Sequence, residues 1–123
     1  MANPEIISAS SIYGKTVYDT DVSNTAASLV SNAASSGKIL KINSLIIGNI
    51  DGTDPADITV TLRNAAGGTT YSTIAHTVAV PADATLVVIS KDTSIYLLED
   101  MSLYVKASVA GDLSATCSYE EIG

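Results

Sequence analysis

Hydrophobic and polar residues alternate along the second half of the chain, most clearly between Pro81 and Ile122. Four strand-like runs follow one another there, separated by short polar breaks. A period of two places successive side chains on opposite faces of a strand, so one face can enter a core while the other meets solvent. The stretch therefore predicts consecutive antiparallel strands. In the last two runs, the residues expected to face the core are Met101, Leu103, Val105, Ala107, Val109, Leu113, Ala115, Cys117 and Tyr119.

The most apolar segment spans residues 38–50 and should form a central, largely buried strand. Neighbouring apolar residues at 39–40 and at 45–47 interrupt its alternation, which indicates a bulge or a strand covered on both sides. Residues 51–57, with the sequence DGTDPAD, predict a turn because Asp, Gly and Pro favour turn geometries.

Further strands are predicted on both sides of this segment. Residues 16–22 and 25–33 are strand candidates diluted by Ala, Asn and Asp, and residues 26–34 could instead form a short helical turn. Downstream, alternation continues at 58–63 and at 71–80 until a proline ends it. In the latter strand, one face should carry Ile74, His76, Val78 and Val80.

These runs add up to eight or nine strands separated by turn signals. We therefore expect an all-β protein, an antiparallel β-sandwich of jelly-roll or immunoglobulin-like type with about eight strands. Residues 16–123 should form this single domain. Residues 1–15 have no clear period and should form an N-terminal arm of the kind that makes oligomer contacts.

Composition narrows the possible functions. The chain has neither Phe nor Trp, so its 13 Ile, 9 Leu and 10 Val must fill the core. Six basic and 13 acidic residues give a net charge of −7, which disfavours nucleic acid as a partner. The acidic excess is explained by solubility, and docking onto a basic partner surface is the alternative explanation. No segment is apolar enough to predict a membrane span. The single cysteine, Cys117, should be a buried thiol in a protein made in a reducing cytoplasm.

Residues capable of chemistry occur singly. His76 is the only histidine and should be a partly buried strand residue. Asp51, Asp54 and Asp57 could offer oxygen ligands to calcium, but Asx-turn chemistry explains the same residues, and their spacing departs from that of an EF-hand loop. We therefore expect no enzyme activity, no cofactor and no metal site.

Tyrosines replace the missing aromatic residues, and most should pack with the hydroxyl group at the rim of the core. Tyr104 is different because it occupies the polar phase of its strand. An exposed ring there could anchor a protein interface. The alternation also turns Lys106 and Glu120 outward, so the predicted docking surface consists of Tyr104, Lys106 and Glu120.

The order VPADATLVVIS, IYLLEDMSLYVKASV and SYEEI resembles short virion proteins of tailed bacteriophages, particularly phages of cyanobacteria and other marine bacteria. The upstream segment SLIIGNIDGTDPADITVTLRNAAGGTTYSTIAHTVAVP is similar to the paired strands of that group, with a Gly-rich hairpin tip. The likeness covers about residues 46–122, and the first 40 residues do not share it. It implies a small β-sandwich built into the particle, on the head or in the neck and tail, and it transfers no catalytic residues.

The leading hypothesis is a capsid decoration or cement protein that binds the major capsid protein and forms a homo-oligomer, with a trimer expected from shell symmetry. It would be made in the host cytoplasm and located in the virion, with neither nucleic acid nor membrane as partner. A neck or tail component, such as an adaptor, tube or fibre-associated protein, is the first alternative. A host-attachment or carbohydrate-binding module is the second, disfavoured by the absence of Trp and an expected scarcity of exposed aromatic residues.

Overall fold

The computed structural model describes residues 5–123, whose regular structure is almost entirely β-strand. Among these residues, no helix is long or apolar enough to cross a membrane. One 3₁₀ turn, η1 (Lys91–Thr93), lies between the sixth and seventh strands. The strands are β1 (Ile12–Asp19), β2 (Ala27–Asn32), β3 (Ile39–Asn49), β4 (Ala56–Asn64), β5 (Thr70–Val80), β6 (Thr85–Ile89), β7 (Ile95–Leu97), β8 (Met101–Ala107) and β9 (Leu113–Ile122).

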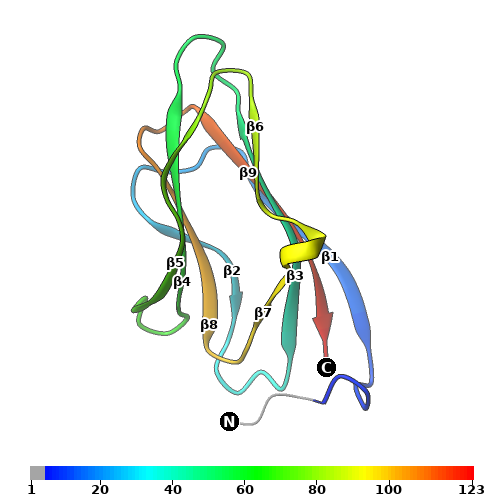
Figure 1. Ribbon diagram of the computed structural model, residues 1–123. Helices are drawn as coiled ribbons and strands as arrows, with labels where there is room; N and C mark the ends of the chain where they lie inside the picture. Colours follow the sequence, from blue (N-terminus) through cyan, green and yellow to red (C-terminus); the bar gives the residue numbers. More distant parts are fainter. Residues whose placement is uncertain (1–4) are drawn as a thin grey trace.

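The strands form two antiparallel sheets that pack face to face (Figure 1). Sheet A has the order β1-β9-β3-β6, with the short β7 also paired to β3, and sheet B has the order β2-β8-β4-β5. The expected all-β antiparallel sandwich is therefore confirmed. Of the two topologies that the sequence left open, this strand order is that of a jelly roll.

Aliphatic side chains from the inner faces of both sheets form the core. Each fully buried Ile, Leu or Val side chain stabilises the fold by about 1.5–3 kcal/mol. Cys117 is completely buried among them, as its phase in the strand predicted, and loss of hydration raises the pKa of its thiol to about 12. The largest fully buried side chains are Ile42, Leu45, Ile47, Ile58, Ile89, Leu97, Leu103 and Leu113.

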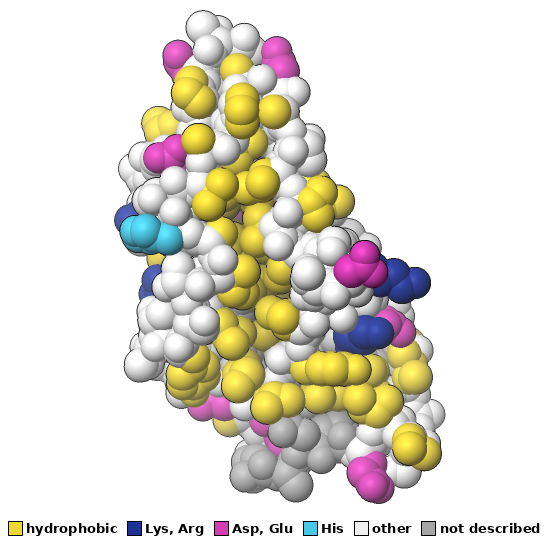
Figure 2. Space-filling model, viewed as in Figure 1, with side chains coloured by type: hydrophobic (Ala, Val, Ile, Leu, Met, Phe, Trp, Pro, Cys, Tyr) yellow, Lys and Arg dark blue, Asp and Glu magenta, His cyan; other side chains and the backbone are white. Residues whose placement is uncertain are grey.

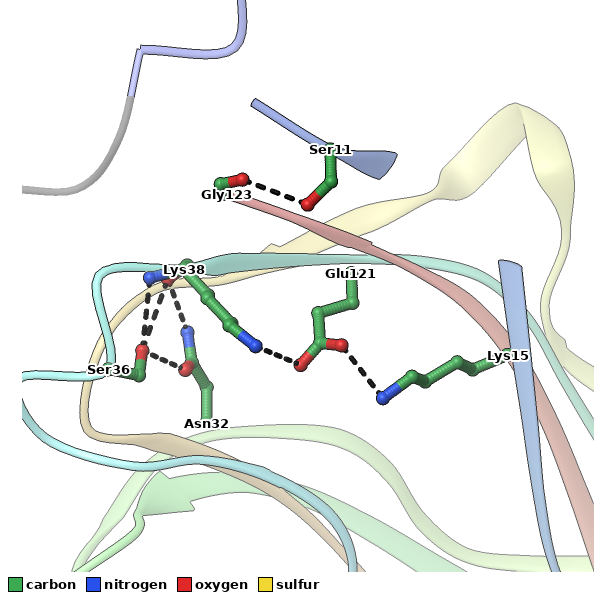
Figure 3. A network of polar contacts seen from close by, with 7 residues as sticks. All are labelled: Ser11, Lys15, Asn32, Ser36, Lys38, Glu121 and Gly123. Carbon is green, nitrogen blue, oxygen red and sulfur yellow. Dashed lines mark hydrogen bonds and ion pairs between the residues drawn. The ribbon is translucent and has the colours of Figure 1, made fainter. Parts of the chain in front are cut away.

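Two buried asparagines connect the sheets at opposite ends of the sandwich. Asn32 of sheet B donates from Nδ2 to the carbonyl oxygens of Lys38 (2.9 Å) and of Leu97 in sheet A (3.0 Å). Figure 3 shows the Asn32–Lys38 contact within the polar network at the lower end. Asn49 of sheet A donates to the carbonyl oxygen of Val80 in sheet B (2.9 Å) and to that of Asp54 (3.0 Å). Buried carbonyl groups therefore gain donors at both ends.

β3 confirms the central, bulged strand expected at residues 38–50. It lies inside sheet A, between β9 and the pair β6 and β7. The register with β9 shifts between Ile42 and Ser44, and the register with β6 shifts between Leu45 and Ile46. The segment 26–34, for which strand and helical turn were both open, contains strand β2.

Three local expectations need correction. The arm was expected to reach residue 15, but β1 begins at Ile12, which pairs with Ile122. Residues 1–4 of that arm lie outside the described residues. β8 ends at Ala107, so Val109 lies in a loop and is 44% exposed.

The third correction concerns β5, where bulges break the predicted alternation. Val78 pairs with Ile58 but Ala75 pairs with Val60, so the pairing with β4 skips two residues of β5. Ala75 consequently packs against the core, and Ile74 is 37% exposed. His76, expected to be partly buried, is exposed.

Candidate interaction surface

Tyr104 and Lys106 both lie on the outer face of sheet B. They belong to β8, whose Leu103, Val105 and Ala107 are buried in the core. Because β8 runs between β2 and β4, the two outward side chains stand near the middle of the sheet. Lys106 is exposed and Tyr104 is half-buried.

Neighbouring residues hold the Tyr104 ring in place. The guanidinium carbon of Arg63 on β4 lies 4.7 Å from the ring centroid, which is a cation–π distance. Arg63 is itself fixed, because its Nε donates to Thr61 Oγ1 at 2.9 Å. Gly68 approaches the Tyr104 hydroxyl from the β4–β5 hairpin and has φ +70°, a conformation that favours glycine. Such a preorganised aromatic side chain loses little entropy when a partner covers it.

A shallow depression of about 280 Å³ lies beside Lys106 on the same face. Thr59, directly opposite Lys106 on β4, forms part of its wall. Most of the lining residues are polar, and none has an aromatic ring on which a sugar could stack, which suits contact with a protein segment better than carbohydrate binding. The lining residues are Asn24, Asp57, Thr59, Thr77, Lys106, Ala107 and Ser108.

Glu120 does not lie with Tyr104 and Lys106. It is on β9 in sheet A, where it lies opposite Lys41 and accepts a hydrogen bond from Asn43 Nδ2 at 3.2 Å. The three predicted residues all point away from the core, but they lie on opposite outer faces of the sandwich. The single docking surface expected from the sequence is therefore divided into Tyr104 with Lys106 on one side and Glu120 on the other.

The structure also leaves one side of the core partly uncovered. β5 and β6 end their respective sheets, and within residues 5–123 no strand pairs with their outer edges. Ala75 of β5 and Leu86 and Val88 of β6 pack against the core but stay partly exposed, and Val78 of β5 is 37% exposed. Figure 2 shows the resulting stripe of hydrophobic side chains running lengthwise between the two sheets. Open edges of this kind accept an additional strand.

Of the three acidic residues between positions 51 and 57, Asp51 and Asp54 lie in the turn that precedes β4. Asp51 Oδ1 accepts hydrogen bonds from the backbone N–H groups of Thr53 (2.8 Å) and Asp54 (3.2 Å), which is Asx-turn geometry and lowers the pKa of the Asp51 carboxyl. Asp57 lies apart, on β4. Within the described part of the chain, no group of three or more His, Cys, Asp or Glu side chains could hold a metal ion. Asx-turn geometry therefore describes Asp51 and Asp54, whereas Asp57 is a strand residue.

Glu121 makes the ion pairs that sequence reasoning missed. Its carboxylate lies 2.7 Å from Lys15 Nζ and 3.2 Å from Lys38 Nζ (Figure 3). Hydrogen bonds from these two ammonium groups lower the pKa of Glu121. Glu120 and Glu121 are indistinguishable as a sequence pair, and Lys15 is 106 residues from Glu121 along the chain, so no local signal could have identified this pairing. Arg63, which supports Tyr104, was missed for the same reason.

Aromatic residues are more exposed than the sequence suggested. Packing of most tyrosines against the core and a scarcity of exposed rings were both expected, and Tyr119 does pack against the core. The exposed tyrosines are Tyr13 (58%), Tyr18 (69%), Tyr71 (51%) and Tyr96 (43%). Exposure therefore makes tyrosine available for contacts on sheet A as well as on sheet B.

No protein-family model and no curated protein matches the sequence. Two solved structures are similar in fold. One comes from Bacillus endospore appendages, described as a family of disulfide-linked pili, with TM-score 0.52 and 15% identity over 99% of this chain and 93% of that chain. The other comes from the T13 IBDV viral particle, with TM-score 0.53 and 14% identity over 93% of this chain. This chain spans only 31% of that viral chain, and identities this low show a common fold alone.

Proposed function

We propose that the protein is a structural component of a phage particle, a capsid decoration or cement protein that binds the shell of the major capsid protein and stabilises it. The observation that carries this proposal is the partly uncovered apolar side of the core between β5 and β6. Apolar residues exposed at unpaired sheet edges stabilise the protein only when a partner covers them. The fold is compatible with this role, since the two similar structures are parts of a viral particle and of pili.

Two features of the surface would act together on a shell. An arm or strand of a capsid subunit adds to the edge of β5 or β6 and covers the apolar stripe with main-chain hydrogen bonds. Tyr104, held by Arg63, provides a rigid anchor on the outer face of sheet B, and Lys106 supplies a positive charge beside it. Burial of both features across neighbouring capsid subunits stabilises the shell because separating the subunits would expose them again.

The attachment should not depend on a disulfide bond. Cys117 is fully buried and its thiol pKa is raised to about 12, so the reactive thiolate is not available to a neighbouring subunit. The chain has no other cysteine. If it assembles, it must do so without the disulfides that link the similar pili.

The test is binding of the purified protein to capsids that lack it. Tyr104→Ala should weaken association by about 10-fold or more, as expected for an interface anchor. Tyr13→Ala is the matched control, because Tyr13 is 58% exposed on β1, away from the outer face of sheet B. Thermal unfolding of both variants checks that the fold is intact. Absence of binding by the wild-type protein refutes the proposal, and equal binding by Tyr104→Ala removes this face from the contact.

A neck or tail component is the second candidate, favoured by the similarity to a pilus protein over nearly the full length of both chains. Pili are repeating axial assemblies, as tail tubes are. Copy number in the particle separates the two roles: hundreds of copies indicate the shell, whereas about a dozen or fewer indicate the neck or tail.

A further inference from the structure

The outer face of sheet A carries a row of exposed side chains that crosses all four strands. Tyr18 of β1 lies opposite Thr116 of β9, Thr116 lies opposite Ile46 of β3, and Ile46 lies opposite Val87 of β6. Tyr18 is 69% exposed, Ile46 37% and Val87 55%. Three large apolar side chains in one cross-strand row are not needed for the core, whose residues all lie on the other face of this sheet.

The same face has further apolar side chains beyond this row. Tyr96 of β7 is 43% exposed, and Ile12 of β1 is 55% exposed. A row of small polar residues, Thr16, Ser118 and Ser44, lies between the first row and these side chains. Apolar side chains on the outer face of a sheet can pack against a second sheet, as inner faces do within β-sandwiches. Exposed apolar side chains gathered on one face indicate an interaction site.

The balance of charge on this face favours a second copy of the same chain as the partner. Lys41 and Glu120 are the only charged residues at outward strand positions among the described strands of sheet A, and they lie opposite each other. The face is therefore neutral in a protein of net charge −7, so two copies can approach there without bringing the excess acidic residues together. A twofold contact also offers each Lys41 the Glu120 of the other copy. A strongly basic or acidic partner would find no complementary charge.

The available area is sufficient for such a contact. The strands β1, β9, β3 and β6 have 8, 10, 11 and 5 residues, and at about 3.4 Å per residue and about 4.8 Å between strands they give a face of about 550 Å² per copy. Two faces would bury about 1,100 Å², which exceeds the about 1,000 Å² expected of a biological interface and is above most crystal contacts. We propose that the outer face of sheet A is a self-association surface through which two copies pack sheet against sheet about a twofold axis.

This inference goes beyond the proposed attachment to a capsid. The two sheets have opposite outer faces (Figure 1), so pairing through sheet A leaves Tyr104 and Lys106 on sheet B free to bind another protein. It also replaces the trimer expected from shell symmetry with a dimer of the free protein. Particle binding and self-association can therefore fail independently.

Sedimentation equilibrium of the full chain tests the proposal. The wild-type protein should be a dimer at concentrations between about 10 and 200 μM, given an interface of this size. Thr116→Lys places a charge in the middle of the row and should weaken dimerisation by about 100-fold or more, because both copies would bury an unpaired ammonium group. Thr73→Lys is the matched control: Thr73 is an exposed strand residue of sheet B, so this variant should dimerise like the wild type.

Each outcome of this experiment either supports or overturns the self-association proposal. A wild-type monomer throughout this range, a trimer, or an unchanged dimer of Thr116→Lys overturns the proposal. Equal dissociation of Thr73→Lys also overturns it, because the effect would then come from added charge and not from this face. If Thr116→Lys fails to fold, as judged by circular dichroism, Val87→Lys at the end strand β6 provides the same test at a 55% exposed position.

Discussion

Asn32 provides a quantitative test of how the two sheets are held together. Its side chain is 3% exposed, and Nδ2 donates to the carbonyl oxygens of Lys38 (2.9 Å) and Leu97 (3.0 Å). Its Oδ1 accepts a hydrogen bond from Ser36 Oγ at 2.6 Å. Asn32→Ala removes all three hydrogen bonds at once.

The expected loss follows from which groups remain without a partner. The Leu97 residue is fully buried, so its carbonyl oxygen loses a donor that water cannot easily replace, at a cost of about 1–3 kcal/mol. Lys38 and Ser36 are more exposed, and water can satisfy them at a cost of about 1 kcal/mol together. We expect Asn32→Ala to lower the free energy of unfolding by about 3 kcal/mol.

Urea unfolding followed by circular dichroism measures this loss. For a domain of this size, about 3 kcal/mol corresponds to a midpoint lower by about 1.5–2 M urea and a Tm lower by about 12 °C. Asn43→Ala is the matched control, because Asn43 makes one hydrogen bond to a side chain on the outer face, and it should cost less than about 1 kcal/mol. A loss below about 1 kcal/mol for Asn32→Ala, or an equal loss for both variants, would refute this explanation.

Three further outcomes follow from the ionisable groups. Cys117 in the native protein should not react with a thiol reagent at pH 8, because its pKa is about 12, and its reaction rate should rise only as the chain unfolds in urea. Two lysines lower the pKa of Glu121 below 4.5, so the stability that its charge adds is present at neutral pH and is lost as the pH falls through the lowered pKa. Glu121→Gln should therefore be less stable than the wild type at pH 7, by under about 1 kcal/mol, and urea titrations should show this difference shrinking as the pH is lowered into the acid range. Loss of hydration, and then the negative charge of Asp51, raise the pKa of Asp112 above 3.8, so ionisation of Asp112 opposes folding as the pH rises. Asp112→Asn should therefore have a higher urea midpoint than the wild type at pH 7 and an equal midpoint at pH 3. A lower midpoint of this variant at pH 7 would show that the Asp112 carboxylate stabilises the fold.

Strand positions and their inward faces were predictable because alternation is a local signal. Leu103, Val105 and Cys117 are buried as their phase indicated, and a turn forms at 51–55 through Asx contacts, with residues 56 and 57 of the predicted turn already in β4. The signal failed at β5, where bulges change the phase and expose His76. A bulge depends on the pairing with β4, and this pairing is absent from the sequence of β5 alone.

For the candidate interaction surface, too, the sequence predicted which residues face outward but not which residues lie together. Sequence alone placed Tyr104, Lys106 and Glu120 outside the core, because a period of two separates inward from outward positions on any strand. It could not place β8 and β9 in different sheets, since both have the same alternation. The sheet of each strand is decided by pairings between distant segments, such as β1 with β9, whose first pair joins Ile12 to Ile122. Only the tertiary structure could therefore separate Glu120 from Tyr104 and bring Tyr18, Ile46 and Val87 into one row, because neighbours across a sheet are selected by packing of the inner faces and not by proximity along the chain.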